Sequence, residues 1–338
     1  MLSRVAGSLY WLSRYIERAE NNARILDVNL QLMLDFEDHP DRGVDAHWSP
    51  IINSLETSDT FRKLYNEINE ETVTDFLTFS KENSSSIYSC IATARENARM
   101  VREQISSEMW EQLNKLYLML KSNAARELFD SSPYEFYKTV VDASQLFQGV
   151  TDATMTHGEG WDFMQFGKFL ERADSSSRIL DVKYHILLPS GEQVGGNVDS
   201  VQWMAVLKSV SAMEAYCKIH VGQVVPWKVA DFLILHDEFP RSLRFCVEAL
   251  DNALHRISGS PASHYHNEAE RLSGRLRSDM EFGTVDEVFR EGLHQFLDRT
   301  QSRLNDIAMA CDKVYCDSLI PDVDERIKAL EAERQTAG

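Results

Sequence analysis

A short acidic and basic motif occurs twice in this sequence: a Glu-Arg pair is followed six residues later by a second Arg. Its members are Glu17, Arg18 and Arg24 in the first copy and Glu171, Arg172 and Arg178 in the second. On a helix, the Glu and the last Arg are nearly two full turns apart and therefore lie on one face. Carboxylate and guanidinium groups held in this way can pair with each other. They can also bind a carboxylate or phosphate ligand while the Glu accepts a proton or anchors an amine.

The motif supports a structural and a chemical interpretation, which do not exclude each other. In the structural one, the two helices pack against each other about a twofold axis and exchange buried ion pairs. We favour it because ion-pair networks are more common than catalytic sites in helical bundles. In the chemical one, Glu17 or Glu171 is the candidate catalytic base, and neighbouring side chains bind the ligand. The candidate ligand-binding side chains are Arg14, Arg18, Asn21, Arg24, Lys168, Arg172, Arg178, Arg99, Arg102 and Arg241.

Two further segments supply the last three members of that set. Residues 95–103 (RENARMVRE) form a predicted helix rich in Arg and Glu that includes Arg99 and Arg102. Residues 239–242 (FPRS) place Arg241 directly after a proline. This segment predicts either a simple helix start or an anion site at a helix N-terminus, where free N–H groups and Arg241 converge.

The two copies of the motif lie within a longer internal repeat. Residues 14–28 (RYIERAENNARILDV) match residues 168–182 (KFLERADSSSRILDV), and the match continues at Cys90 and Cys246. The offset stays between 154 and 156 residues over this length. We predict a tandem duplication whose halves are related by a pseudo-twofold axis and form one compact unit. The predicted boundaries are 1–150 for the first repeat, 151–320 for the second, and 321–338 for an exposed C-terminal helix or tail.

Apolar residues recur at helical spacing through most of the chain, and no stretch alternates with a period of two. Helix start signals are also present. Ser132, Thr156 and Thr284 each precede a Glu by three residues, as in a capping box, and Pro133 suits a first helical turn. The sequence therefore predicts an all-α fold of roughly a dozen helices, arranged as two similar bundles.

Composition limits the classes of function. The 338 residues are 43% apolar, which is enough for a large core and excludes a disordered chain. The net charge of −18 repels phosphate backbones, so nucleic acid is not an expected partner. Five cysteines without framework spacing indicate a reducing compartment, and no apolar run reaches the ~20 residues of a membrane span. Arg4, Arg14 and Glu17 interrupt the apolar N-terminal stretch, unlike a secretion signal, so we expect a cytoplasmic protein.

Sequence motifs for common catalytic and metal sites are missing. There is no phosphate-binding loop, dinucleotide fingerprint or nucleophile elbow. Cys311 and Cys316 have the wrong spacing for a zinc ribbon. Glu291 and His294 supply only one of the two pairs that a di-iron bundle requires. The sequence thus predicts no metal and no cofactor.

Several segments together resemble the Alpha-E family, an uncharacterised bacterial α-helical family named for its Glu-Arg signature. The resemblance covers roughly residues 1–315. Its segments are LSRVAG at 2–7, YIERAEN at 15–21 with Arg24, RENAR at 95–99, WEQLN at 110–114, GW at 160–161, LERA at 170–173 and FPRS at 239–242. One departure is the pair Gly158 and Glu159, where an Arg-Asp-like pair is expected, and it leaves the role of His157 open. The family's catalytic residues are not established, so the resemblance transfers none.

The resemblance implies a functional context. Alpha-E proteins accompany circularly permuted ATP-grasp ligases, which join a carboxylate to an amine, and a transglutaminase-like peptidase is a further candidate partner. We therefore expect a helical accessory protein that is not itself an enzyme. It binds the neighbouring ATP-grasp ligase, or its carboxylate or peptide substrate, through the Glu-Arg helices. Two alternatives stay open: an enzyme acting on a peptide-like or anionic small molecule, and a purely structural module that forms a homo-oligomer.

Overall fold

The computed structural model describes residues 1–36, 44–55, 57–187, 197–222 and 224–316, and the predicted tail at 321–338 lies outside them. Within this part of the chain the fold is all-α, as predicted, with sixteen α-helices, one short π-helix and no strand. The sequence predicted about a dozen helices. The additional helices have seven to nine residues, and these are too short to show a periodic apolar face. None of the described helices combines the length and apolar character needed to span a membrane.

Two successive sets of helices make up the described chain, called here the first half and the second half. The first half comprises α1 (Ser3–Phe36), α2 (Val44–Ser54), α3 (Ser58–Leu64), α4 (Glu70–Thr78), α5 (Ile87–Met100), α6 (Ser107–Lys121), α7 (Asn123–Ser131) and α8 (Pro133–Thr154). The second half comprises α9 (Glu159–Leu187), α10 (Asn197–Ser209), α11 (Met213–Ile219), α12 (Pro226–Leu235), α13 (Leu243–Ser258), α14 (Glu268–Phe282), α15 (Val285–Glu291), α16 (Leu293–Cys311) and the π-helix η1 (Asp312–Cys316).

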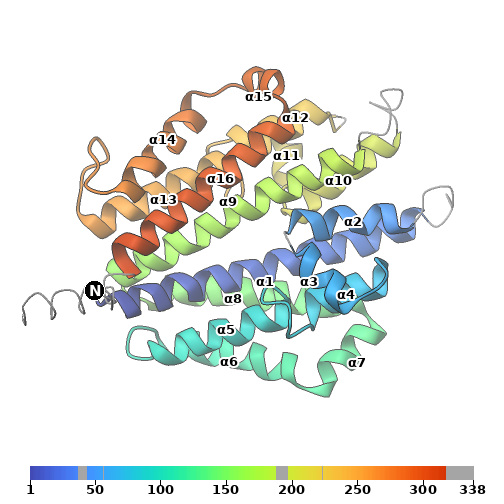
Figure 1. Cartoon of the computed structure of the whole chain (residues 1–338), viewed down its shortest axis with the longest axis horizontal. Coiled ribbons are helices and arrows are strands. Elements are labelled where there is room, and N and C mark those ends of the chain that lie inside the picture. Colours follow the sequence, from blue (N-terminus) through green and yellow to red (C-terminus); the bar gives the residue numbers. More distant parts are fainter. Residues whose placement is uncertain (37–43, 56, 188–196, 223, 317–338) are drawn as a thin grey trace, which may run out of the picture.

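The two longest helices, α1 and α9, lie side by side in the middle of the molecule (Figure 1). They run in the same direction, since the N-terminal ammonium of Met1 pairs with the Glu159 carboxylate at the start of α9. At Gly167 the two helices approach so closely that a Cβ atom would lie 2.5 Å from the Tyr10 carbonyl oxygen. A side chain larger than hydrogen therefore does not fit at this crossing.

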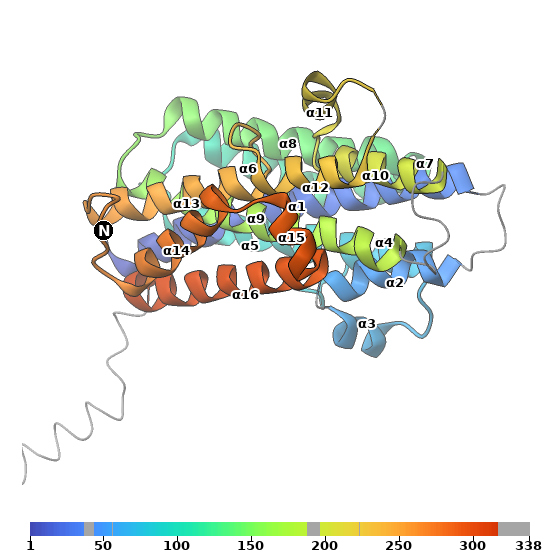
Figure 2. The same cartoon turned by 90° about the horizontal axis from the view of Figure 1, so that it is seen from above.

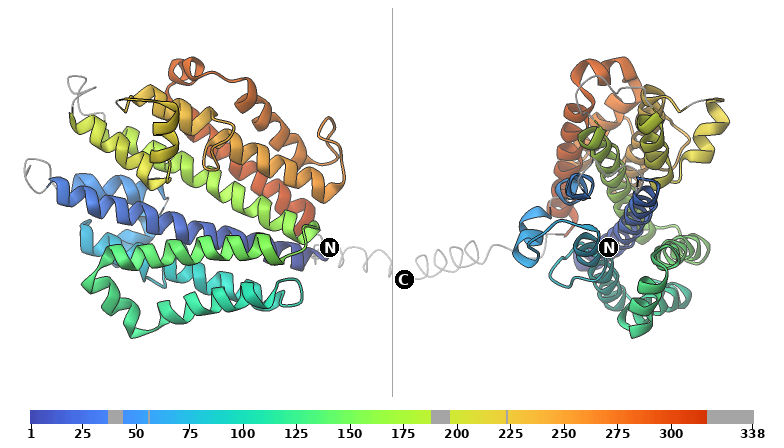
Figure 3. Two further views of the ribbon diagram at one scale, coloured as in Figure 1. Left: turned by 180° about the vertical axis from the view of Figure 1, so that it is seen from behind. Right: turned by 90° about the vertical axis from the view of Figure 1, so that its right-hand side faces the viewer.

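Each central helix is covered mainly by helices of its own half, but α2 packs on α9 and α10 packs on α1. α5 and α8 pack on α1, and α6 packs on both of them. In the same way α13 and α16 pack on α9, and α14 packs on both. Figure 3 shows α5–α8 and α12–α16 on opposite sides of the contact between α1 and α9, and Figure 2 shows the short helices α3 and α11 projecting on opposite sides. This packing brings residues from both halves together along one long contact.

Buried apolar side chains explain why α1 lies at the centre. Leu9, Leu12, Ile16 and Ala19 are all buried against neighbouring helices. Polar residues in the same turns are buried as well, among them Glu17 with a side chain that is 0% exposed. A buried ionised side chain needs hydrogen-bond and ion-pair partners. The polar side of α1 is therefore the candidate place for a functional site.

Helix starts follow the capping signals in part. Thr284 forms the predicted reciprocal capping box with Glu287. Ser132 caps α8, with a proline in its first turn. The capping box predicted at Thr156 is wrong, because α9 begins only at Glu159.

Candidate functional site

The two copies of the Glu-Arg motif meet across the contact between α1 and α9 and form two clusters. The Glu171 cluster consists of Glu171 on α9 with Arg14 and Arg18 on α1. The Glu17 cluster consists of Glu17 on α1 with Arg172 on α9 and Arg241 from the loop before α13. Each Glu therefore pairs with the Arg of the opposite motif, as in the exchange of ion pairs that the structural interpretation describes.

In the Glu171 cluster, two arginines of α1 hold one carboxylate. Arg18 donates from Nε to Glu171 Oε1 (2.5 Å) and from Nη2 to Oε2 (2.9 Å). Arg14 donates from Nε to Oε2 (2.8 Å) and from Nη1 to the hydroxyl of Tyr10 (2.7 Å). The fork of Arg18 thus matches the carboxylate in a bidentate pair, and Arg14 adds a third charge-assisted bond.

In the Glu17 cluster, the carboxylate is enclosed more completely. Arg172 forms the bidentate pair, from Nε to Glu17 Oε1 and from Nη2 to Oε2, both at 2.8 Å. Arg241 donates from Nη1 to Oε1 (2.9 Å), and Gln148 of α8 donates to Oε2 (3.3 Å). Both oxygens of Glu17 therefore accept two hydrogen bonds.

Arg241 also ties the Glu17 cluster to further residues of α1. Its Nη2 donates to Glu20 Oε1 (2.6 Å), and its Nη1 donates to the side-chain oxygen of Asn21 (2.8 Å). Glu20 in turn accepts two bonds from Arg24, whose Nη1 reaches the Ser211 hydroxyl (2.5 Å). The loop segment begins a helix, since Ser242 caps α13, and the Arg241 guanidinium pairs with the Glu17 and Glu20 carboxylates of α1.

Electrostatics keep both central glutamates ionised. Burial alone would raise the pKa of Glu17, but Arg172 and Arg241 outweigh it and lower this pKa to about 2. Burial alone would also raise the pKa of Glu171, but Arg18 and Arg14 outweigh it and lower this pKa to about 2. A general base works best with a pKa near the operating pH and a lone pair facing its substrate. Neither carboxylate meets these two conditions.

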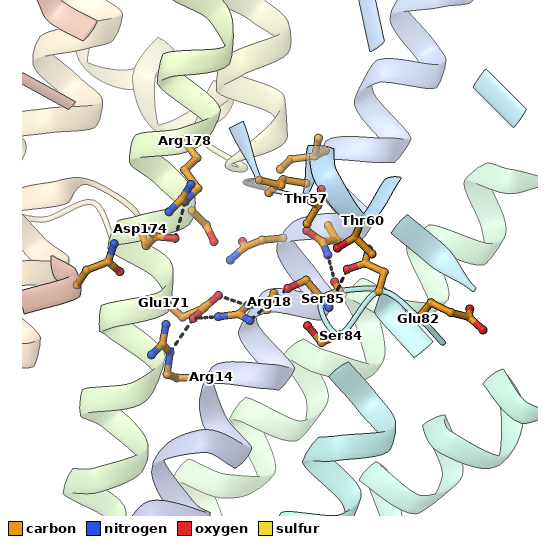
Figure 4. Close-up of a pocket in the computed structure, with 17 residues that line it drawn as sticks. Arg14, Arg18, Thr57, Thr60, Glu82, Ser84, Ser85, Glu171, Asp174 and Arg178 are labelled. Atoms are coloured by element: carbon orange, nitrogen blue, oxygen red, sulfur yellow. Dashed lines mark hydrogen bonds and ion pairs between the residues drawn. The ribbon is translucent and has the colours of Figure 1, made fainter. Parts of the chain in front are cut away.

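A cavity of about 350 Å³ opens beside the Glu171 cluster (Figure 4). It is bounded by α1, α9, the α2–α3 connection with the first turn of α3, the loop before α5 and one residue of α16. In Figure 4, Arg14 and Arg18 are directed at Glu171 and Arg178 at Asp174. Hydroxyl and amide groups form most of the remaining lining. The charged residues of the lining are Arg14, Arg18, Arg178, Glu82, Glu171 and Asp174.

A difference between two loops explains why the cavity lies on this side. Ser86 caps α5 and Ser242 caps α13, so Ser85 and Arg241 occupy the position before the cap in the two halves. The Arg241 guanidinium enters the Glu17 cluster. The shorter Ser85 side chain reaches only to within 3.4 Å of Arg18 Nη1 and lines the cavity. Each carboxylate therefore binds two arginines, but the second one is Arg14 of α1 at Glu171 and the loop residue Arg241 at Glu17, so the loop at Ser85 leaves space.

Two polar atoms at the cavity have no hydrogen-bond partner in the described part of the chain. They are the amide nitrogen of Asn21 and the Oδ1 oxygen of Asp174. Arg241 fixes the Asn21 oxygen and Arg178 binds the other Asp174 oxygen (2.8 Å), so both side chains are oriented. Asn21 is only 2% exposed, and leaving such a buried donor unpaired is costly. Asn21 and Asp174 both line the cavity, so each brings to it a side chain with one polar atom that lacks a partner among the described residues.

The structure places the predicted ligand-binding residues in different surroundings. Arg14, Arg18, Asn21 and Arg178 line the cavity, whereas Arg172, Arg24 and Arg241 lie in or beside the Glu17 cluster. The Lys168 ammonium lies 4.5 Å from the Phe169 ring centre, and burial lowers the pKa of Lys168 to about 8. Two predicted residues lie outside both clusters at the end of α5: Arg99 pairs with Glu96, and Arg102 lies over the Trp110 ring.

Several site residues were not singled out from the sequence as site residues. Glu20 and Asp174 look like ordinary helical acids, but each pairs with the Arg four residues later. Asn22 donates to the Ser85 carbonyl oxygen (2.6 Å) and so fixes the loop at the cavity. The contrast between residues 83–86 (NSSS) and 239–242 (FPRS) was the one signal in the sequence that pointed to this loop.

Candidate metal ligands from the sequence do not gather. Within the described ranges, no three His, Cys, Asp or Glu side chains come together as metal ligands. His294 lies 2.7 Å from the Asp181 carboxylate, while Glu291 pairs with Arg299. The helical spacing of Glu291 and His294 thus reflects separate contacts.

A known protein family shares the Glu-Arg motif of this chain. A family called Alpha-E, described as "a predicted alpha-helical domain with a conserved ER motif", matches residues 1–315. The chain is 24% identical over 326 residues to uncharacterised proteins of Mycobacterium bovis and of two Mycobacterium tuberculosis strains. Each alignment covers 90% of this chain and 36% of the relative, so the chain spans about a third of the length of these curated relatives. No solved structure matches the chain.

Proposed function

The chain belongs to the Alpha-E family, and from this premise we propose that it is a helical accessory protein of an ATP-grasp system that forms peptide or amide bonds. In this role it binds the ligase, its carboxylate or peptide substrate, or both, and does not itself catalyse the reaction. The observation that carries the proposal is the polar cavity beside the Glu171 cluster. Its volume lies at the lower end of the range for small-molecule sites.

The state of the two central glutamates supports binding rather than catalysis. Glu17 and Glu171 are buried, ionised and fully occupied by arginines. Their charge is therefore used to join α1 to α9, and removing either partner of such a pair is strongly destabilising. The clusters act as a rigid frame, and the cavity beside one of them is the part that a ligand can enter.

The partner in this proposal comes from the family resemblance. ATP-grasp ligases activate a carboxylate as an acyl phosphate and transfer it to an amine. A companion that holds a carboxylate-bearing molecule among arginines fits that chemistry. We place this role in the cytoplasm, and the transglutaminase-like peptidase is the second candidate partner.

We also propose that the two halves arose from one duplicated helical unit. Support comes from the offset of 154 to 156 residues, from the matching packing around α1 and α9, and from the reciprocal pairs of Glu17 with Arg172 and of Glu171 with Arg18. In an experimental structure, one rotation should superimpose α1, α5, α6 and α8 on α9, α13, α14 and α16 in that order. Helices that fail to align in this order would overturn the duplication.

The accessory role is tested with a circularly permuted ATP-grasp ligase from the same organism, the partner that the family resemblance implies. The ligase is captured on the immobilised full chain, and product formation is measured with and without the chain present. Two variants carry the same chemical change: Ser85→Arg in the cavity and Ser278→Arg on the exposed face of α14. We expect wild type and Ser278→Arg to capture the ligase and to raise product formation, and Ser85→Arg to lose the gain in product.

Two results would overturn the accessory role. One is that the wild-type chain does not capture the ligase. The other is that the amount of product is the same with and without the chain. Circular dichroism of both variants checks that a loss in Ser85→Arg does not come from unfolding.

A further inference from the structure

We propose that the cavity binds a zwitterionic amino acid, with its carboxylate at Arg18 and Asn21 and its ammonium at Asp174. This specifies the ligand of the binding role proposed above and rests on that role. The cavity offers a donor region and an acceptor region on opposite helices, since Arg18 and Asn21 lie on α1 and Asp174 lies on α9.

The donor region consists of groups one helical turn apart. Arg18 and Asn21 are three residues apart on α1 and therefore lie on the same face. Arg18 uses Nε and Nη2 on Glu171, and the contact of its Nη1 with Ser85 is long at 3.4 Å. The amide nitrogen of Asn21 has no partner among the described residues. A ligand carboxylate is the acceptor that can take both donors, and a guanidinium strengthens such a bond.

The acceptor region is a carboxylate oxygen. Asp174 Oδ2 accepts from Arg178 Nε, while Oδ1 is buried and accepts no hydrogen bond from the described residues. An ionised oxygen without a donor is costly in such a place, and an ammonium supplies three N–H donors. Asp174 therefore favours the amine end of the ligand.

The groups in the cavity disfavour simpler ions. The lining contains three arginines and three carboxylates, and the carboxylates of Glu171 and Asp174 already pair with those arginines. A pure anion such as phosphate would leave the Asp174 oxygen unpaired and repel it. A pure cation would leave the Asn21 donor unpaired and face Arg18. A molecule that carries both charges satisfies both regions, and the volume of about 350 Å³ suits one small molecule.

The test is calorimetric titration of the full chain with the common free L-amino acids, one at a time, in the absence of any ligase. The best binder is then compared with its N-acetyl form and with its carboxamide form, and inorganic phosphate is titrated separately. We expect at least one free amino acid to bind, and each blocked form to bind about tenfold or more weakly.

Variants assign the two ends of the ligand. Ser85→Arg fills the cavity and should abolish binding, while the matched control Ser278→Arg should bind like wild type. Asp174→Asn keeps an acceptor for Arg178 but removes the charge. It should weaken binding of the free amino acid about tenfold and leave the N-acetyl form unchanged.

Three results would overturn the inference: no free amino acid binds, the blocked forms bind as tightly as the free one, or phosphate binds more tightly. Failure here is distinguishable from failure of the accessory role. If the ligase is captured but no amino acid binds, the accessory role stands with another ligand. If amino acids bind but no ligase is captured, the binding site stands without that partner.

Discussion

The Glu17 and Glu171 clusters lie on the same two helices and use the same residue types, yet one is closed and the other borders a cavity. Both contain a buried carboxylate and a bidentate arginine from the opposite helix. They differ at the residue before a helix cap, where Arg241 enters the Glu17 cluster and Ser85 leaves space at the Glu171 cluster. The comparison shows how one motif can fix a helix contact at one point and border a cavity at the next.

The largest expected difference between the clusters is in the cost of removing the glutamate charge. Glu17→Gln leaves the buried guanidinium of Arg172 without its carboxylate partner and leaves Arg241 with Glu20 alone, which should lower the free energy of unfolding by about 3–5 kcal/mol. Glu171→Gln should cost about half as much, because Arg18 is 24% exposed and water in the cavity can solvate it. Urea denaturation of both variants measures the difference. Equal losses, or a larger loss for Glu171→Gln, would contradict the distinction between closed and open clusters.

The next effect concerns the residue that closes the Glu17 cluster. Arg241→Ser removes the shared donor of Glu17, Glu20 and Asn21, so it should lower the free energy of unfolding by roughly 2–4 kcal/mol. The control is Arg99, an exposed arginine that pairs with Glu96. Arg99→Ser should change the free energy of unfolding by less than about 0.5 kcal/mol. Thermal unfolding at constant pH compares the two. An Arg241→Ser variant as stable as the control would show that the closure contributes nothing.

Acid should weaken both clusters, and the pH range follows from the direction of the shifts. Each glutamate has a folded pKa of about 2 and an ordinary value of 4.5. The stabilisation is therefore fully present above pH 4.5 and is lost as the pH falls from there towards 2. Denaturation at several pH values should show this decline in the wild type and a shallower one in Glu171→Gln. Identical slopes in both proteins would mean that Glu171 does not contribute to the decline.

The smallest expected effect is kinetic and concerns two buried thiols. Burial raises the pKa of Cys90 and of Cys246 to about 12, so neither thiol should react quickly in the folded protein. Cys90 lies beneath the Ser84 carbonyl oxygen at the cavity, and Cys246 lies beneath the Pro240 carbonyl oxygen next to Arg241. Mass spectrometry after thiol alkylation should show exposed Cys217 modified first, then Cys90, and Cys246 several-fold more slowly. Faster modification of Cys246 than of Cys90 would contradict the tighter closure of its cluster.

Much of the fold could be predicted because it depends on local and repeated signals. Helical periodicity predicted the all-α class, and the motif that occurs twice predicted that the helices of Glu17 and Glu171 meet. The short helices α3 and α11 could not be predicted, since two turns carry no recognisable stripe. Arg99 and Arg102 show that residue types alone do not identify a site. Arg99 pairs with a neighbouring Glu on the surface of its own helix, and Arg102 lies over a Trp ring.

The cavity itself could not be predicted, because it depends on what the small residues Ser84 and Ser85 leave empty. Residue types indicate which groups can interact, whereas an open space depends on how two loops and two helices pack together. The unpaired amide nitrogen of Asn21 could not be predicted either. The orientation of this side chain depends on Arg241, which lies 220 residues later in the chain and donates to the amide oxygen.

The most direct test of the account is a crystal structure of the Ser85→Arg variant. The account predicts that the new guanidinium lies in the cavity, within hydrogen-bond distance of the Glu171 or Asp174 carboxylate, and that the contact between α1 and α9 is unchanged. A guanidinium directed to solvent, or a rearranged Glu171 cluster, would contradict the claim that the short Ser85 side chain leaves the cavity open beside this cluster.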